Sequence, residues 1–270
     1  PLALGTRGKQ RLSILIYHRV VTEFDPMRPA EPSREIFDWQ MRLVRQHFNP
    51  LSLLEALDKL ESGQLPERAI CVTFDDGYAD NELHAMPILR KYAVPATVFV
   101  SPGFLNGGRM WNDSLIEFFR CFRGDSLDLN ELGLGRHDTA NMDARLASAE
   151  RVIGEIKYRD PAERVQLVEQ IQGRFEGEGR PDDLMMTDAQ VRSLASNGIS
   201  IGAHTVNHPI LASVTDEVAH REIQDSKARL EDMLQQSVDV FAYPNGRPGQ
   251  DYRKEHVAMV KSLGFRAAVS

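Results

Sequence analysis

Short apolar segments alternate with amphipathic segments along most of this chain, and this alternation constrains its fold more than any other feature. Between the apolar segments, apolar residues recur at three- or four-residue steps, as at Phe37, Met41 and Val44. Buried strands that alternate with helices are typical of a parallel sheet with crossover helices, so the sequence predicts an α/β fold. The predicted strands are residues 12–17, 70–74, 96–100, 199–203, 238–242 and 265–269.

Helix starts are marked by capping residues. Ser52 with Glu55, and Thr187 with Gln190, have the spacing of a capping box, in which each side chain bonds the other's backbone N–H. Two longer helices are predicted at residues 81–92 and 216–234.

The alternation is interrupted between Pro102 and Pro181. No strong strand pattern occurs there, and the apolar spacing is helical at Val152, Ile156, Val165, Leu167 and Ile171. We therefore expect one α/β domain over residues 1–270 that carries a mostly helical insertion at about residues 102–181. The chain ends at Ser270 within the last apolar segment, so we expect the strand-and-helix pattern to stop early.

Charge and composition exclude several classes of protein. Lys and Arg number 32 against 39 Asp and Glu, a net charge of −7 that argues against nucleic acid as the main partner and suits a neutral glycan. No apolar run approaches the roughly 20 residues that a membrane-spanning helix needs. We expect a soluble, bacterial-type protein of the cytoplasm or the periplasm, with no prediction between the two and none of oligomeric state.

Polar side chains follow several predicted strands directly. His18 follows the first strand, Asp75 and Asp76 follow the second, and His204 follows the strand at residues 199–203, with His208 four residues later. In parallel α/β folds such strand ends gather functional groups at one edge of the sheet. Two adjacent carboxylates repel each other unless a cation or a proton relieves their charge, so a metal ion is favoured here.

The spacing of His204 and His208 lets both imidazoles face one ion, from a helical turn or from a compact loop. Two imidazoles and one carboxylate suit Zn²⁺, and Co, Ni, Mn or Fe suit the same donors. Taken alone, an Asp-Asp-Gly turn or a pair of histidines is usually structural. Their joint occurrence at two strand ends favours a metal site in which one aspartate binds the ion and the other acts as a base.

Several motifs resemble those of the polysaccharide deacetylases, also called the NodB-homology or carbohydrate esterase family 4 enzymes. The similar segments read TFDDGY at 73–78, HTVNH at 204–208 and FAYPNG at 241–246, with YHRV at 17–20. The resemblance implies a distorted, incomplete (β/α) barrel and a metal-dependent hydrolase, usually a zinc enzyme. It further implies an acetylated polysaccharide or oligosaccharide as substrate, from which N- or O-acetyl groups are removed in exopolysaccharide or cell-wall metabolism.

Residue by residue, the resemblance implies that Asp75 is the general base and that Asp76, His204 and His208 are the metal ligands. The metal would polarise the acetyl carbonyl and acidify water, while Asp75 takes the proton from the attacking water. The backbone N–H of Asn245 would help to stabilise the oxyanion.

The sequence departs from the family pattern in the third motif. Ala242 stands where the family usually has an arginine that orients the base, and Asn245 stands where it usually has an aromatic residue. Arg247 lies close enough in sequence to replace the missing guanidinium. The family's catalytic-acid histidine belongs to a motif beyond the final strand, so His18 is the best candidate for the acid within these residues.

Aromatic side chains near the strand ends are candidates for sugar binding, because an aromatic face suits the apolar face of a sugar. We expect Trp111, Tyr78, Tyr243 and Arg247 to contact the substrate. Two alternatives stay open: a small-molecule hydrolase of non-peptide C–N bonds on the same barrel, and a glycan-binding protein impaired in catalysis. An open groove favours the glycan, and a closed pocket favours the small molecule.

Overall fold

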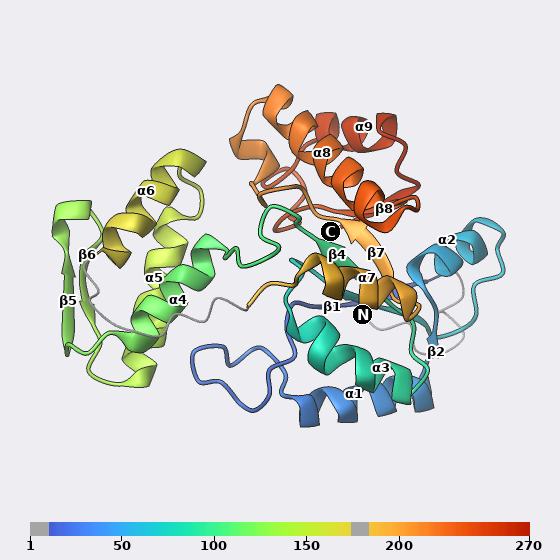
Figure 1. Ribbon diagram of the computed structural model, residues 1–270, viewed down its shortest axis with the longest axis horizontal. Helices are drawn as coiled ribbons and strands as arrows, with labels where there is room; N and C mark the ends of the chain where they lie inside the picture. Colours follow the sequence, from blue (N-terminus) through green and yellow to red (C-terminus); the bar gives the residue numbers. More distant parts are fainter. Residues whose placement is uncertain (1–10, 174–183) are drawn as a thin grey trace.

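A curled parallel sheet forms the centre of the molecule in the computed structural model, which describes residues 11–173 and 184–270 (Figure 1). Its main strands lie in the order β1-β3-β4-β7-β8-β9, and the short β2 pairs with the start of β3. No pairing joins β1 to β9 in the described residues, so the barrel is open, which confirms the predicted incomplete (β/α) barrel. The strands are β1 (Ser13–Tyr17), β2 (Asn49–Pro50), β3 (Ala69–Phe74), β4 (Ala96–Val100), β7 (Ser200–Ala203), β8 (Val240–Ala242) and β9 (Ala267–Val269).

Helices cover the sheet between successive strands. Their starts follow the capping signals: Ser33 accepts a hydrogen bond from Ile36 N, and Thr187 forms a full capping box with Gln190. The capping box predicted at Ser52 is only half formed, because the Glu55 carboxylate lies near Lys59 instead. These helices are α1 (Arg34–His47), α2 (Leu53–Glu61), α3 (Met86–Lys91), α7 (Asp188–Ser196), α8 (Asp216–Leu234) and α9 (Lys254–Ser262).

The main hydrophobic core lies between the sheet and these helices. Every residue of β3 and β4 is buried, which explains why both strands read as continuous apolar runs in the sequence. Phe37, Phe74 and Phe241 are fully buried in this core. No helix among the described residues is long and apolar enough to cross a membrane.

The helix predicted at residues 81–92 begins as one turn of π-helix, Asn81–Ala85, before α3. The widened turn lies beside the loop that follows β1: Asn81 Nδ2 donates to the His18 carbonyl at 2.9 Å, and Asp80 accepts from Val20 N at 3.2 Å. These buried tethers fix the chain after β1 against the start of α3. Turns of this kind inside α-helices are frequent near functional sites.

A separate lobe lies between β4 and α7 and projects to the left in Figure 1. The sequence shows no strong strand pattern in this segment, yet β5 and β6 form an antiparallel hairpin. Each strand has only four residues, too few for its alternation of buried and exposed residues to stand out, and Gly133 makes the turn with a φ of +70°. The expected insertion includes residues 174–181, which lie outside the described residues. The lobe comprises α4 (Trp111–Cys121), β5 (Ser126–Leu129), β6 (Gly135–Asp138), α5 (Met142–Ile156) and α6 (Pro161–Gln172).

The lobe has its own hydrophobic core. Leu115, Phe119, Val152 and Ile171 are fully buried in it, and none of them belongs to the core of the main sheet. Met27, from the loop after β1, also packs into this second core. The lobe and the sheet are therefore two packing units joined by loops.

Candidate metal centre and cleft

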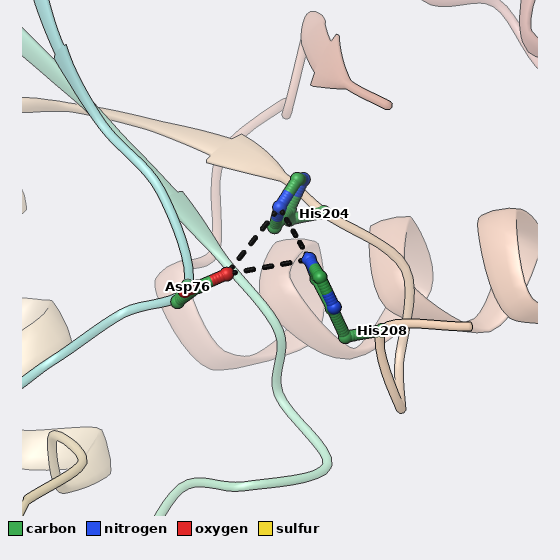
Figure 2. A group of neighbouring side chains, drawn as sticks. All are labelled: Asp76, His204 and His208. Carbon is green, nitrogen blue, oxygen red and sulfur yellow. Dashed lines mark hydrogen bonds and ion pairs between the residues drawn. The ribbon is translucent and has the colours of Figure 1, made fainter. Parts of the chain in front are cut away.

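The ends of two strands bring Asp76, His204 and His208 together (Figure 2). Asp76 comes two residues after β3, His204 directly follows β7, and His208 lies further along the same loop. The Asp76 Oδ1 atom is 3.5 Å from His204 Nε2 and 3.4 Å from His208 Nε2. The two Nε2 atoms are 3.1 Å apart, so the three donor atoms converge on one point.

The backbone holds two of these residues in an unusual conformation. Asp76 has a φ of +77°, His208 of +52°, and Thr205 of +60°, all in the left-handed region that side chains other than glycine seldom adopt. The histidines therefore lie on a compact loop and not on a helical turn. Strained backbone of this kind gathers at functional sites, where the surrounding structure maintains it.

A carboxylate on α8 maintains the histidine loop. Glu222 accepts hydrogen bonds from the backbone N–H groups of Val206 and Asn207 and from the Asn207 side-chain amide, each at 2.8 Å. Nothing in the sequence pattern pointed to Glu222, because it lies on a helix 14 residues beyond His208.

The donor set fits a divalent cation. His204 Nδ1–H donates to the Ala242 carbonyl at 2.8 Å, which leaves the lone pair of Nε2 directed at the shared point. Asp76 Oδ1 is buried and has no hydrogen-bond partner among the described residues. A buried carboxylate oxygen without a partner is costly, and a cation at this point would satisfy it. Two imidazoles and one carboxylate are a donor set that Zn²⁺ accepts.

The charges at the site are strongly coupled. Burial acts to raise the pKa of Asp76, but the neighbouring His208 and His204 outweigh it and hold that pKa below its usual value. Burial lowers the pKa of His208 to about 3, which keeps this imidazole neutral at physiological pH. Burial also opposes a charge on His204, but Asp76 and Asp75 outweigh burial and raise its pKa. A proton on His204 and a divalent cation therefore compete for the same negative charge.

Asp75 lies beside the three donors and lines the cleft with a half-buried side chain. Burial raises the pKa of Asp75, Asp76 raises it further, and His204 and His18 oppose them. No arginine contributes to this balance in the described parts of the chain, in agreement with Ala242 at the position where the family usually has one. Arg247 is exposed, does not line the cleft, and lies near Tyr158.

The cleft that contains these side chains has a volume of about 560 Å³. His18 lines it from the end of β1, close enough to Asp75 and Asp76 to lower the pKa of each. Asn245 lines it after β8, with a φ of +61°. The structure thus brings both predicted catalytic partners of Asp75 to the same cleft.

The three predicted aromatic contacts also line the cleft, but they differ in exposure. Trp111 begins α4 and is half-buried. Tyr78 is buried and donates its hydroxyl to Asp113 at 3.0 Å, so it holds α4 near the sheet as well as lining the cleft. Tyr243 is buried and stacks on Tyr252 with ring centroids 3.9 Å apart.

Two cations of the lobe also line the cleft, and the sequence analysis missed both. Lys157 follows α5, and Arg164 lies in α6. Nothing in their spacing separates them from the other basic residues of this segment, because only the folded lobe brings them opposite the strand ends.

Comparison with known proteins identifies the class to which this fold and site belong. Residues 62–115 and 166–268 match the family described as polysaccharide deacetylase. These segments make up more than half of the chain, so the chain belongs to the polysaccharide deacetylase family, the hydrolases of carbohydrate esterase family 4. The resemblance predicted from the motifs is confirmed, and the family implies an acetylated polysaccharide as substrate.

Individual relatives are more distant. YxkH of Bacillus subtilis is 23% identical over 269 residues, which are 99% of this chain and 67% of YxkH. The poly-beta-1,6-N-acetyl-D-glucosamine N-deacetylase of Staphylococcus aureus is 32% identical over 111 residues, and the match spans 41% of this chain and 38% of that enzyme.

Solved structures share the fold. IcaB from Ammonifex degensii aligns with a TM-score of 0.60 and 20% identity, over 96% of this chain and 85% of that one. The deacetylase PplD of Streptococcus pyogenes aligns with a TM-score of 0.58 and 23% identity, over 94% of this chain and 80% of that one. Both alignments extend through the lobe as well as the sheet, since they cover nearly the whole chain.

Proposed function

We propose that this protein removes acetyl groups from an exopolysaccharide or cell-wall glycan with the help of a divalent metal ion, zinc being the best fit. The observation that carries the proposal is the buried Asp76 Oδ1 next to Asp75: it has no hydrogen-bond partner within residues 11–173 and 184–270, and it lies 3.5 and 3.4 Å from two imidazole Nε2 atoms. The activity named for the staphylococcal relative supports an exopolysaccharide substrate. The cleft is large enough for sugar units on either side of the acetylated one.

Six residues of the cleft have chemical roles in this proposal. Asp76, His204 and His208 would hold the ion, which supplies a Lewis acid and acidifies water when bound. Asp75 accepts the proton of the attacking water. The Asn245 backbone N–H stabilises the developing oxyanion, and His18 donates a proton to the leaving amine or alkoxide.

The substrate contacts and the domain layout follow from the same cleft. Trp111, Tyr78 and Tyr243 all line it, and we assign them to contacts with the glycan. We treat residues 1–270 as one deacetylase domain in which the inserted lobe forms one wall of the cleft.

The test is acetate release from acetylated glucosamine oligomers, with the metal content measured on the same samples. We expect a chelator to abolish release and zinc to restore it. Asp75→Asn removes the base, so kcat should fall by at least about 10²-fold while zinc content stays unchanged.

Asp143→Asn is the matched control, because Asp143 is an exposed carboxylate in the first turn of α5 outside the cleft. Its kcat should equal that of the wild type. Full activity of the Asp75→Asn variant would refute the assignment of the base, and oligosaccharide binding without any acetate release would favour a glycan-binding protein.

A further inference from the structure

Arg164 is a buried cation that lines the same cleft as the candidate metal centre. Its side chain lines the cleft although the residue is only 6% exposed. One guanidinium nitrogen donates to the Lys157 carbonyl at 3.0 Å, and the guanidinium carbon lies 4.8 Å from the centre of the Trp111 ring. Its Nε–H is buried and has no hydrogen-bond partner among the described residues.

Lys157 adds a second cation to the same wall. It is half-buried at the end of α5, and its ammonium lies 5.6 Å from the centre of the Tyr158 ring. Burial is the main cause of a lowered pKa at Lys157, with Arg247 acting in the same direction and Asp251 opposing it. We call Lys157 and Arg164 the cationic wall.

The cationic wall lacks the carboxylates that other cations of this region have. Arg28 pairs with Asp113 at 2.8 Å, and Arg120 with Asp25 at 2.6 Å. Within the described residues, neither member of the wall forms an ion pair. Two carboxylates influence these cations electrostatically, and both already accept hydrogen bonds from other groups. Asp160, which acts on Arg164, caps α6; Asp251, which acts on Lys157, accepts hydrogen bonds from the Tyr158 hydroxyl and the Arg247 backbone N–H.

A buried guanidinium without a carboxylate partner costs stability, which is tolerated where a ligand supplies the missing charge. Glu150 and Glu31 also line the cleft, but neither is among the groups that act on the pKa of Lys157 or Arg164. Lys157 and Arg164 line the same cleft as His204 and His208. A ligand bound at the wall therefore shares this cleft with the sugar that loses its acetyl group.

We propose that the cationic wall binds an anionic substituent, a carboxylate or a phosphate, on a sugar next to the one that loses its acetyl group. This inference rests on the proposed deacetylation and specifies its substrate class as an acidic glycan. Arginine recognises both anions through paired N–H donors, and the Trp111 ring under the guanidinium keeps its plane fixed. The net negative charge of the chain does not oppose this, because the positive charge is local to the cleft.

Acetate release from three oligomers of equal length tests the proposal: neutral N-acetylglucosamine, alternating N-acetylglucosamine and glucuronic acid, and a phosphodiester-linked N-acetylglucosamine. We expect kcat/KM for at least one of the acidic oligomers to exceed the neutral value about tenfold, chiefly through KM. The two acidic substrates separate carboxylate from phosphate recognition. The preference should shrink as salt is added.

Variants of the wall make the test specific. Arg164→Gln and Lys157→Gln should each remove most of the preference, so that kcat/KM for the acidic oligomer falls toward the value that the same variant has for the neutral one. Arg164→Lys should retain part of the preference. Arg159→Gln is the matched control, because Arg159 pairs with Glu163 and does not line the cleft. If Arg164→Gln does not fold, the preference measured with Lys157→Gln tests the proposal in its place.

Calorimetric binding of the same oligomers separates this inference from the proposed function. Equal kcat/KM for neutral and acidic oligomers, unchanged in the wall variants, overturns the cationic wall and leaves deacetylation standing. If no oligomer releases acetate, deacetylation fails. In that case, tighter binding of an acidic oligomer that is lost in Arg164→Gln upholds the wall, and equal binding of all oligomers refutes it.

Discussion

At the scale of single residues, the donors of the metal centre could be predicted but their geometry could not. The types and spacing of His204, His208 and the two adjacent aspartates favour a cation site, and the family resemblance implies Asp76 as the ligand among the two. The left-handed backbone of Asp76 and His208 carries no sequence signal, since no glycine marks it. Such a conformation depends on distant partners, and the partner of the histidine loop is Glu222 on α8.

Replacing Glu222 tests this dependence. In Glu222→Gln a single neutral oxygen remains to accept the three hydrogen bonds that the carboxylate accepts in the wild type, so the loop is held less firmly and His208 loses its fixed position. We expect zinc affinity to fall about 10- to 100-fold. Competition with a chromogenic chelator measures the affinity. Asp225→Asn, an exposed change on the same helix, should leave it unchanged, and a wild-type affinity in Glu222→Gln would contradict the role assigned to this carboxylate.

At the scale of helices and strands, elements with a clear pattern of buried apolar residues could be predicted from the sequence. Elements that depend on hydrogen bonds to distant residues could not. The strand at residues 96–100 and the helix at 216–234 have the predicted bounds, because the strand is a short buried run and the helix has a capping residue and helical apolar spacing. The hairpin of β5 and β6 was missed because each strand has only four residues, too few for an alternating pattern to be recognised. The π-helical turn at Asn81–Ala85 was missed because buried bonds to the neighbouring loop produce it, and local propensity does not.

The contact between β4 and β7 depends on one glycine. A Cβ at Gly202 would lie 2.4 Å from a ring atom of Phe99, which is fully buried. We expect Gly202→Ala to lower the free energy of unfolding by about 1–3 kcal/mol, because the ring has no room to move. Gly154→Ala in α5 meets no atom within 4 Å and should instead raise it by about 0.5–1 kcal/mol. Urea denaturation of the two variants measures both changes. A Gly202→Ala variant with the wild-type free energy of unfolding would show that β4 and β7 can move apart to admit the methyl group.

At the scale of the whole molecule, the loop after β1 joins the sheet to the lobe by charge. Arg28 is buried between Asp113 and Glu117 of α4, and Asp25 pairs with Arg120 of the same helix. None of these pairs was predicted, because their partners lie some 85 to 95 residues apart and the sequence offers no pattern at that separation.

The pairing of Asp25 predicts a pH dependence of stability. Burial acts to raise the pKa of Asp25, but the hydrogen bond and charge of Arg120 and the Met27 backbone N–H outweigh it and lower that pKa. A lowered pKa in the folded state stabilises the protein above the unfolded value near 4, and this stabilisation is lost as pH falls through the folded value.

Asp25→Asn should therefore lower the free energy of unfolding by about 1 kcal/mol near pH 7, a small figure because solvent screens the partly exposed pair. The difference from wild type should shrink toward zero near pH 3. Urea denaturation across this range measures it, and a difference that is constant with pH would mean that Asp25 acts through packing and not through its charge.

The two hydrophobic cores have a consequence for how such an enzyme diversifies. The strand ends that present the proposed metal ligands pack around one core, and the lobe that carries Lys157 and Arg164 packs around the other. On the functions proposed above, a substitution in the lobe would alter which neighbouring sugar is preferred without disturbing Asp75 and Asp76. Selection can vary the recognised glycan and conserve the reaction, because the two properties are encoded in parts of the chain that are stabilised separately.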